Sequence, residues 1–146
     1  MFEEIVYKFL SQFDEEIQVE EDTEFAYYYV KSLITYPTGF GFGLPSKERY
    51  LFKSHILNDY GLDLSDETAY VVFSLLHEMG HHMTLDDMDD EDATNEIAMR
   101  EVIHLIEDVD TANQAYFKLP SEVLANDWAY EHFSEEMVKR FATLMQ

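Results

Sequence analysis

Apolar residues recur at intervals of three and four over much of the chain, a spacing typical of amphipathic helices. The N-terminal segment shows it first, and three later stretches repeat it between acidic or glycine-containing segments. We therefore predict helices over Phe2–Phe13, Ser65–Met83, Ala93–Ala115 and from Pro120 to the C-terminus, the last allowing for a bend.

The segment Phe25–Leu44 has a different pattern. Aromatic and β-branched residues dominate Phe25–Val30 and Leu33–Tyr36, and such residues favour strands. Pro37 and the glycines after it interrupt regular structure. We expect two or three short antiparallel strands here, preceded over Asp14–Glu24 by a solvated acidic turn.

The helices on either side of Gly61 differ in how clearly they are signalled. Pro45–Tyr60 is ambiguous, although it is compatible with a helix that Gly61 ends. The next helix has a clear start, because Ser65 supplies a hydroxyl cap and acids follow in the first turn. Its apolar side faces away from two histidines, which separates a core side from a polar side. The apolar residues are Val72, Leu75, Met79 and Met83, and the histidines are His77 and His81.

Composition limits the classes of protein that this chain can form. A 47% hydrophobic fraction with 15% aromatics supports a packed core, and 146 residues suffice for one domain, 1–146. With strands confined to one segment, we expect an α+β fold that is mostly helical. The chain has no cysteine, which excludes disulfides and thiolate metal sites. No apolar run approaches the length of a membrane span and the first residues lack a basic signal region, so we expect a cytoplasmic protein.

The charge balance is strongly acidic. Nine Lys and Arg stand against 31 Asp and Glu, a formal net charge of −22. Such a surface repels phosphate backbones and anionic lipids, which argues against nucleic-acid and membrane partners and favours cations and basic proteins. Acids make up nearly all of Asp86–Asp92. This segment lacks the glycine and glutamate positions of an EF-hand, so we expect a solvated loop.

The residues His77-Glu78-Met79-Gly80-His81 form an H-E-x-x-H pattern within a predicted helix. Helical positions four apart are about 40° apart around the axis, so both imidazoles can reach one metal ion. Glu78 is turned by about 100° and can act on a water at that ion. The pattern predicts zinc chemistry in which the ion lowers the pKa of water and Glu78 accepts the proton. Gly80, a poor helix former, permits close approach of another backbone.

Two histidines leave zinc short of the three protein ligands that are usual in catalytic sites. Without cysteine, the third ligand must be His, Asp or Glu. Glu122 stands out slightly, because a helix there places it on one face with Asn126 and with the small residues Ala125 and Ala129. Spacing leaves its rivals open: they are Glu96, Glu101, His104, Glu107 and Asp108.

Two motifs, H-E-M-G-H and E-x-x-A-N-x-W-A, resemble the ImmA/IrrE family of small zinc metallopeptidases. The resemblance covers Ser65–Phe133, with Trp128 where the family pattern has Phe. It implies a zincin-like, gluzincin-type core with a short curved antiparallel sheet beside the H-E-x-x-H helix. The long interval between the motifs, and the absence of the Met-Pro that often follows the second one, depart from the family pattern and bear on the substrate.

The resemblance also assigns roles to residues. It implies Zn²⁺ bound by His77, His81 and Glu122, with Glu78 as the catalytic base. The leading hypothesis is therefore a zinc-dependent peptidase acting on a specific basic regulatory protein, such as the repressor of a phage or other mobile element. The alternative is a non-catalytic acidic zinc-binding module that mimics DNA or sequesters a basic protein. A degenerate peptidase serving as a chaperone or antitoxin-like partner is a third reading. An intact Glu78 favours the enzyme, because a structural zinc site needs no base.

Two features that bear on the substrate stay open at this point. A residue that supports the ligands or stabilises an oxyanion is needed, and the sequence does not select among Tyr116, Asn126, Tyr130 and His132. The run Phe40-Gly41-Phe42-Gly43 lacks the lysine and spacing of a phosphate loop. We expect it to form a strand at the rim of the cleft, where it would pair with an extended substrate.

Overall fold

The computed structural model describes residues 2–41 and 46–146. Helices dominate this part of the chain and a small sheet accompanies them, which confirms the α+β, mostly helical expectation. The α-helices are α1 (Phe2–Leu10), α2 (Lys47–Tyr60), α3 (Glu67–Met83), α4 (Asp90–His104), α5 (Val109–Phe117), α6 (Pro120–His132) and α7 (Glu135–Leu144). The strands are β1 (Gln18–Asp22), β2 (Ala26–Tyr28) and β3 (Leu33–Pro37), and the 3₁₀ segments are η1 (Tyr29–Lys31) and η2 (Thr38–Gly41).

The segment Phe25–Leu44 forms two antiparallel strands, as predicted, but a third strand makes the sheet mixed, so the antiparallel sheet implied by the family resemblance is wrong. The sheet order is β1-β3-β2, with β2 antiparallel and β1 parallel to the central β3. Strand β1 lies in the segment expected to be a solvated turn. Its acidic side chains are tolerated because it is an edge strand with exposed residues, where charge also discourages pairing with other chains. Phe40 and Gly41 belong to η2 rather than to a rim strand, and the rest of that predicted strand lies outside the described residues.

Several helix boundaries differ from the prediction because capping groups differ. Asp66, not Ser65, caps α3, its carboxylate accepting a hydrogen bond from the backbone N–H of Ala69 at 3.0 Å. Asp89 caps α4, so the predicted acidic loop becomes helical from Asp90 onward. The helix predicted over 93–115 is two helices, because Asp108 starts α5 by accepting from the N–H of Thr111.

The first helix is shorter than predicted, because α1 ends at Leu10 and a turn replaces its last residues up to Phe13. The remaining boundaries agree with the sequence. The segment before Gly61 is helical, and Gly61 ends α2 with φ +69° while its N–H donates to the Leu57 carbonyl at 3.0 Å. Helix α3 ends at Met83 as predicted. The C-terminal helix does bend, and it breaks completely at Phe133 before Ser134 caps α7.

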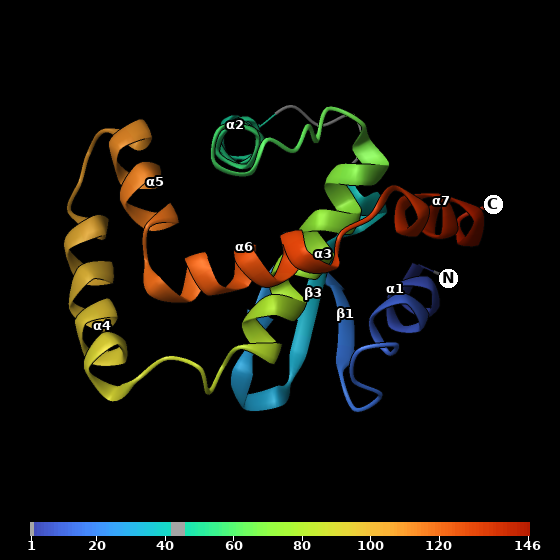
Figure 1. Cartoon of the computed structure of the whole chain (residues 1–146), viewed down its shortest axis with the longest axis horizontal. Helices are drawn as coiled ribbons and strands as arrows, with labels where there is room; N and C mark the ends of the chain where they lie inside the picture. The colour runs from blue at the N-terminus through green and yellow to red at the C-terminus, as the bar shows by residue number, and fades with distance from the viewer. Residues whose placement is uncertain (1, 42–45) are drawn as a thin grey trace.

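Helix α3 is the centre of the molecule (Figure 1). The sheet lies along one side of it, α6 crosses it on another, and α1 and α7 pack near its N-terminal half. Helices α4 and α5 stand together at the opposite end of the view from α1 and α7. No described helix is both long and apolar enough to cross a membrane.

The enclosure of α3 explains its composition. Every residue from Ala69 to Gly80 is buried, including the apolar Val72, Leu75 and Met79 of the predicted core side. Met83, predicted to join that side, is 43% exposed because it lies in the last turn, beyond the elements that cover the helix. Aromatic rings from other elements close the core around α3, and burying such rings is a large part of its stabilisation.

The contact between α3 and α6 is a close approach of two backbones. A Cβ atom at Gly80 would lie 2.6 Å from the carbonyl oxygen of Ala125 and 3.0 Å from its Cα. Ala125 and Ala129 are fully buried on the facing side of α6. Small residues on both helices therefore set the separation of the two axes, as the sequence indicated for Gly80.

We expect Gly80→Ala to destabilise the fold. Alanine normally stabilises a helix interior by about 1 kcal/mol over glycine, but overpacking here costs more, so the net loss should be about 1–2 kcal/mol. Urea denaturation measures it. Asn95→Ala, on the exposed face of α4, is the control and should change stability by less than about 0.5 kcal/mol. A Gly80→Ala protein as stable as the parent would contradict the close approach.

Candidate metal centre

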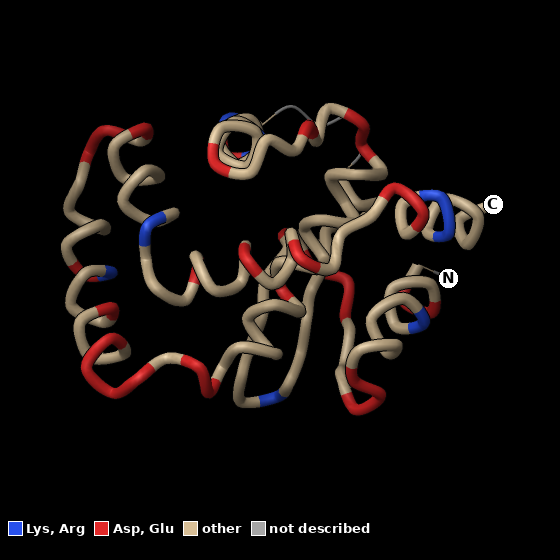
Figure 2. The backbone as a smooth tube through the Cα atoms, in the orientation of Figure 1, with Lys and Arg blue, Asp and Glu red and all other residues tan. Residues whose placement is uncertain are grey.

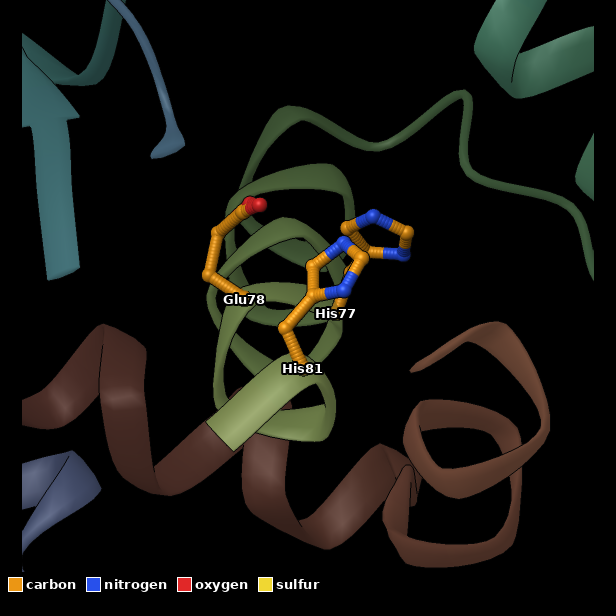
Figure 3. Close-up of side chains that lie close together, drawn as sticks. All are labelled: His77, Glu78 and His81. Carbon is orange, nitrogen blue, oxygen red and sulfur yellow. The ribbon is translucent and has the colours of Figure 1, made fainter. Parts of the chain in front are cut away.

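The C-terminal half of α3 brings three potential metal-binding groups together. One ligand atom from each of His77, Glu78 and His81 lies within 4.8 Å of the others. Figure 3 shows the two imidazoles projecting from the same side of the helix, with the Glu78 side chain extending beside them. The spacing of H-E-x-x-H on a helix produces this arrangement, because residues four apart share a face.

Glu122 of α6 contacts both imidazoles. Its Oε1 lies 3.1 Å from His77 Nε2, and its Oε2 lies 2.9 Å from His81 Nε2. Donor atoms of a tetrahedral zinc ion with bonds near 2.0–2.1 Å are about 3.3 Å apart, so two imidazole nitrogens and a carboxylate at these separations fit such an ion after small movements. Nitrogen and oxygen donors without sulfur also suit zinc. A divalent metal ion therefore fits the site.

Asn126 fixes the orientation of His77. Its Oδ1 accepts a hydrogen bond from His77 Nδ1 at 2.6 Å, and the amide side chain is 1% exposed. A proton held at Nδ1 leaves Nε2, the nitrogen facing Glu122, free to bind a metal. The sequence placed Asn126 near the site without a defined role, and the structure gives it this contact with a ligand.

The electrostatics of the two glutamates differ. Burial favours protonation of Glu122, but hydrogen bonds from His77 and His81 outweigh it and hold the pKa of this carboxyl well below its usual range. Burial lowers the pKa of His77, whereas the hydrogen bond to Glu122 and the charge of Glu78 raise it, to about 9 in balance. Burial raises the pKa of Glu78 against the opposing charges of His77 and His81. Glu122 is therefore ionised, as a ligand must be, and Glu78 takes up a proton more readily than an ordinary glutamate.

Two cavities meet at this site. One of about 600 Å³ runs along the N-terminal side of α3, and one of about 530 Å³ runs beside β2 and α4. Glu78, Tyr116 and Glu122 line both of them. The carboxylate of Glu78 thus faces open space, while no hydrogen bond or ion pair ties it to another described residue.

Tyr116 is the tyrosine that the structure brings to the site. Its side chain lies near Glu122, and desolvation, followed by the charges of Glu122 and Glu78, raises its pKa far above the usual range. The phenol therefore keeps its proton and can donate it in a hydrogen bond. Tyr130 and His132 point elsewhere: Tyr130 packs against Tyr60 at 5.1 Å between ring centroids, and His132 stacks on Trp128 at 4.0 Å.

The rival third ligands are directed away from the imidazoles. The side chains of four of them, Glu101, His104, Glu107 and Asp108, lie on exposed positions of α4 and of the turn that follows it. Glu96 is buried, but its carboxylate belongs to another network. It accepts hydrogen bonds from the backbone N–H and the hydroxyl of Ser121, both at 2.7 Å, and from Arg100.

Glu96 anchors the residue next to Glu122, a role that no sequence pattern indicated. Through Glu96, helix α4 holds the first turn of α6 and places Arg100 Nη2 3.7 Å from Glu122 Oε2.

A second contact outside the predictions joins Tyr27, His82 and Asp14, with hydrogen bonds of 2.8 Å and 2.6 Å to the His82 ring. The ring of Tyr27 in turn lies parallel to that of His81 at 6.5 Å between centroids. These contacts join residues far apart in the sequence, so no local pattern of hydrophobic and polar positions predicts them.

Comparison with known proteins gave no assignment: no family model, curated protein or solved structure matches the chain.

We expect Asn126→Ala to weaken zinc binding by about 10- to 100-fold, because the hydrogen bond that orients His77 is lost. Isothermal titration of zinc into the metal-free protein measures this, and His77→Ala should abolish stoichiometric binding. Tyr130→Phe, on the same helix but directed at Tyr60, is the control and should bind zinc like the parent. Unchanged affinity in Asn126→Ala would show that this contact does not support a metal ligand.

Proposed function

We propose that the chain is a zinc-dependent peptidase of the kind that the ImmA/IrrE resemblance implies. The observation that carries the proposal is Glu78: a buried carboxylate with a raised pKa, beside a His-His-Glu donor set, facing two cavities and bound to no other described residue. A metal site that only stabilises the fold does not require a buried carboxylate that faces open space and has no bonding partner. A hydrolytic site requires one, because water must lose a proton as it attacks.

His77, His81 and Glu122 would hold the zinc. Zinc bound there would acidify a water molecule and polarise a peptide carbonyl. Glu78 accepts the proton of the attacking water and then passes it to the departing amine, which its raised pKa favours. Asn126 keeps the Nδ1 proton of His77 in place throughout.

Tyr116 supplies the hydrogen bond that an oxyanion needs. It stands on α5, across the cleft from α3, and reaches Glu122 at the meeting point of the two cavities. Because its pKa is raised, the hydroxyl stays protonated and costs no reorganisation when charge develops on the carbonyl oxygen.

An extended polypeptide is the substrate that this cleft fits best. The two cavities leave the site in different directions, one for each side of the cleaved bond. Strand β2 lies at the free edge of the sheet and lines the second cavity, so its backbone is available for pairing with a peptide strand.

The negative electrostatic field of the acidic surface favours a basic substrate protein. Acidic residues gather on the segment leading into α4, on the turn between α4 and α5 and on the turn before β1 (Figure 2). A basic regulatory protein, such as the DNA-binding repressor of a mobile element, would approach this surface rapidly because opposite fields speed encounter.

The first test is Glu78→Gln. The zinc-loaded protein is incubated with a tryptic peptide library of a bacterial proteome, and cleavage products are identified by mass spectrometry. We expect zinc-dependent cleavage by the parent protein, a loss of at least about 10²-fold in Glu78→Gln, and retention of zinc by that variant. Glu91→Gln, an exposed residue of α4, is the control. Full activity in Glu78→Gln would refute the mechanism, and no cleavage by the parent would favour the non-catalytic binding module.

The second test concerns the oxyanion. We expect Tyr116→Phe to lower kcat by about 10²-fold with little change in zinc affinity, because one donor to the transition state is lost. Tyr130→Phe provides the matched control, since the same atom is removed from a tyrosine outside the cleft. If both variants cleave the best library peptide at the parent rate, Tyr116 is not the donor.

A further inference from the structure

The larger cavity connects the metal centre with a tyrosine two helical turns away. Tyr70, Ser74 and His77 follow one another on one face of α3, and all three line this cavity. Seven residues of helix rise about 10 Å, which equals the length of about three residues of an extended peptide. A substrate that leaves the centre along α3 therefore reaches Tyr70 about three residues from its cleaved bond.

Two cations from α2 converge on the Tyr70 ring. The guanidinium carbon of Arg49 and the ammonium nitrogen of Lys53, one helical turn later, each lie 4.9 Å from the ring centroid. Arg49 also lines the cavity. Tyr70 itself is only 6% exposed, so the two charges rest on a nearly buried aromatic surface, where contact with a cation is favourable.

Neither cation has an acid in direct contact, although the chain has 31 Asp and Glu for nine Lys and Arg. Lys53 acts on Asp63 from a greater distance, where hydrogen bonds from Ser65 and the charge of Lys53 together lower the pKa of that carboxyl. No carboxylate of the described residues lies within 4.0 Å of Arg49 or Lys53. Three other cations do have such partners: Lys47 lies 3.1 Å from Asp110, Arg100 3.1 Å from Glu96 and Arg140 2.9 Å from Glu136. The remaining four, Lys8, Lys31, Lys118 and Lys139, also have no ion pair with a described carboxylate. What distinguishes Arg49 and Lys53 from the other unpaired cations is that both converge on one nearly buried aromatic ring beside the cavity.

The position of Arg49 is fixed by the fold. Its Nη2 donates a hydrogen bond to the carbonyl oxygen of Phe40 at 2.7 Å. Gly41 leaves the space for it, because a Cβ atom there would collide with the guanidinium. One bond to a carbonyl uses only part of the five-donor guanidinium, so its remaining donors and its charge are available to a ligand in the cavity.

We propose that Arg49 and Lys53, seated on Tyr70, form a carboxylate-binding subsite for the substrate. The subsite takes the carboxylate of an acidic side chain or of a peptide C-terminus about three residues from the cleaved bond, on one side of that bond only. This inference rests on the proposed peptidase function. It refines the substrate class, because the acidic surface attracts a basic protein as a whole while the cleft selects a segment with a carboxylate at one defined position.

Cleavage preferences provide the first test. In the peptide library, we expect Asp, Glu or a free C-terminus to be enriched about tenfold at the third or fourth residue on one side of the cleaved bonds. Arg49→Gln removes the first charge and keeps a polar side chain, and Lys53→Gln removes the second charge. Each should lose most of the enrichment while still cleaving neutral peptides. Lys31→Gln, an exposed residue of η1 outside this cavity, is the control and should keep the enrichment.

Charge reversal sharpens this test. In Arg49→Glu, or in Lys53→Glu if the first does not fold, the preference should turn from acidic residues to Lys and Arg at the same position. Thermal unfolding of each variant identifies a loss of fold.

Binding without catalysis separates this inference from the proposed function. Zinc-loaded Glu78→Gln protein is titrated with four probes: Ac-Ala-Ala-Ala-Glu-NH₂, its Gln counterpart, tetra-alanine with a free carboxylate and tetra-alanine amide. The Arg49 Nε–H signal in NMR spectra reports binding. We expect at least one carboxylate probe to bind about tenfold more tightly than its amide, and the two pairs distinguish a side-chain from a C-terminal carboxylate.

The outcomes are distinct. If carboxylate probes bind more tightly than amides but the parent protein cleaves no peptide, the proposed peptidase function is refuted and the carboxylate-binding subsite is supported. If peptides are cleaved without enrichment of acidic residues near the cleaved bond, or if carboxylate and amide probes bind equally, the subsite is refuted while the peptidase function stands.

Discussion

The close approach of α3 and α6 is the constraint on which the candidate site depends. Gly80 lies one residue before His81, and Ala125 lies between Glu122 and Asn126, so the point of closest backbone contact is also the point where ligands and supporting residues face each other. A larger residue at either place would move a whole helix rather than one side chain. The packing that holds the core together therefore also sets the separation of the imidazoles from Glu122, and rigid elements give better-defined sites than loops do.

The sequence predicted what depends on local order. Helical spacing located α3, and the H-E-x-x-H pattern implied that His77 and His81 share a face, which follows from helix geometry alone. It missed β1, because Ile17 and Val19, which alternate with polar residues, stand within a run of acids that favours a solvated turn. It missed the break before α5 because an aspartate cap inside an otherwise helical stretch is a weak signal. The choice of Tyr116 over Tyr130 depends on how α5 and α6 pack, and no spacing within the chain encodes that.

Three buried glutamates show three ways of placing a carboxylate inside a protein. Glu122 is compensated by two imidazoles, and Glu96 by a helix N-terminus with a hydroxyl and an arginine. Glu78 has no hydrogen-bond partner among the described residues, and only the nearby charges of His77 and His81 offset the cost of burying its carboxylate. Burial therefore raises its pKa. A net charge counted over the chain does not distinguish these environments. It likewise conceals that two of its few cations, Arg49 and Lys53, converge on the ring of Tyr70 beside the cleft.

Helix α4 buries a single residue, and that residue is Glu96. The attachment of this helix to α6 is therefore polar, whereas α3 is held by apolar contacts on almost every side. Salt screens charge interactions and leaves hydrophobic burial largely intact, so these two parts of the molecule differ in what loosens them. Because α4 buries so little, we expect its amides to exchange with solvent hydrogen faster than those of α3. The candidate metal-binding residues of α3 thus lie in the part of the fold held by apolar burial, and Glu96, the anchor of α6, lies in a part held by polar contacts.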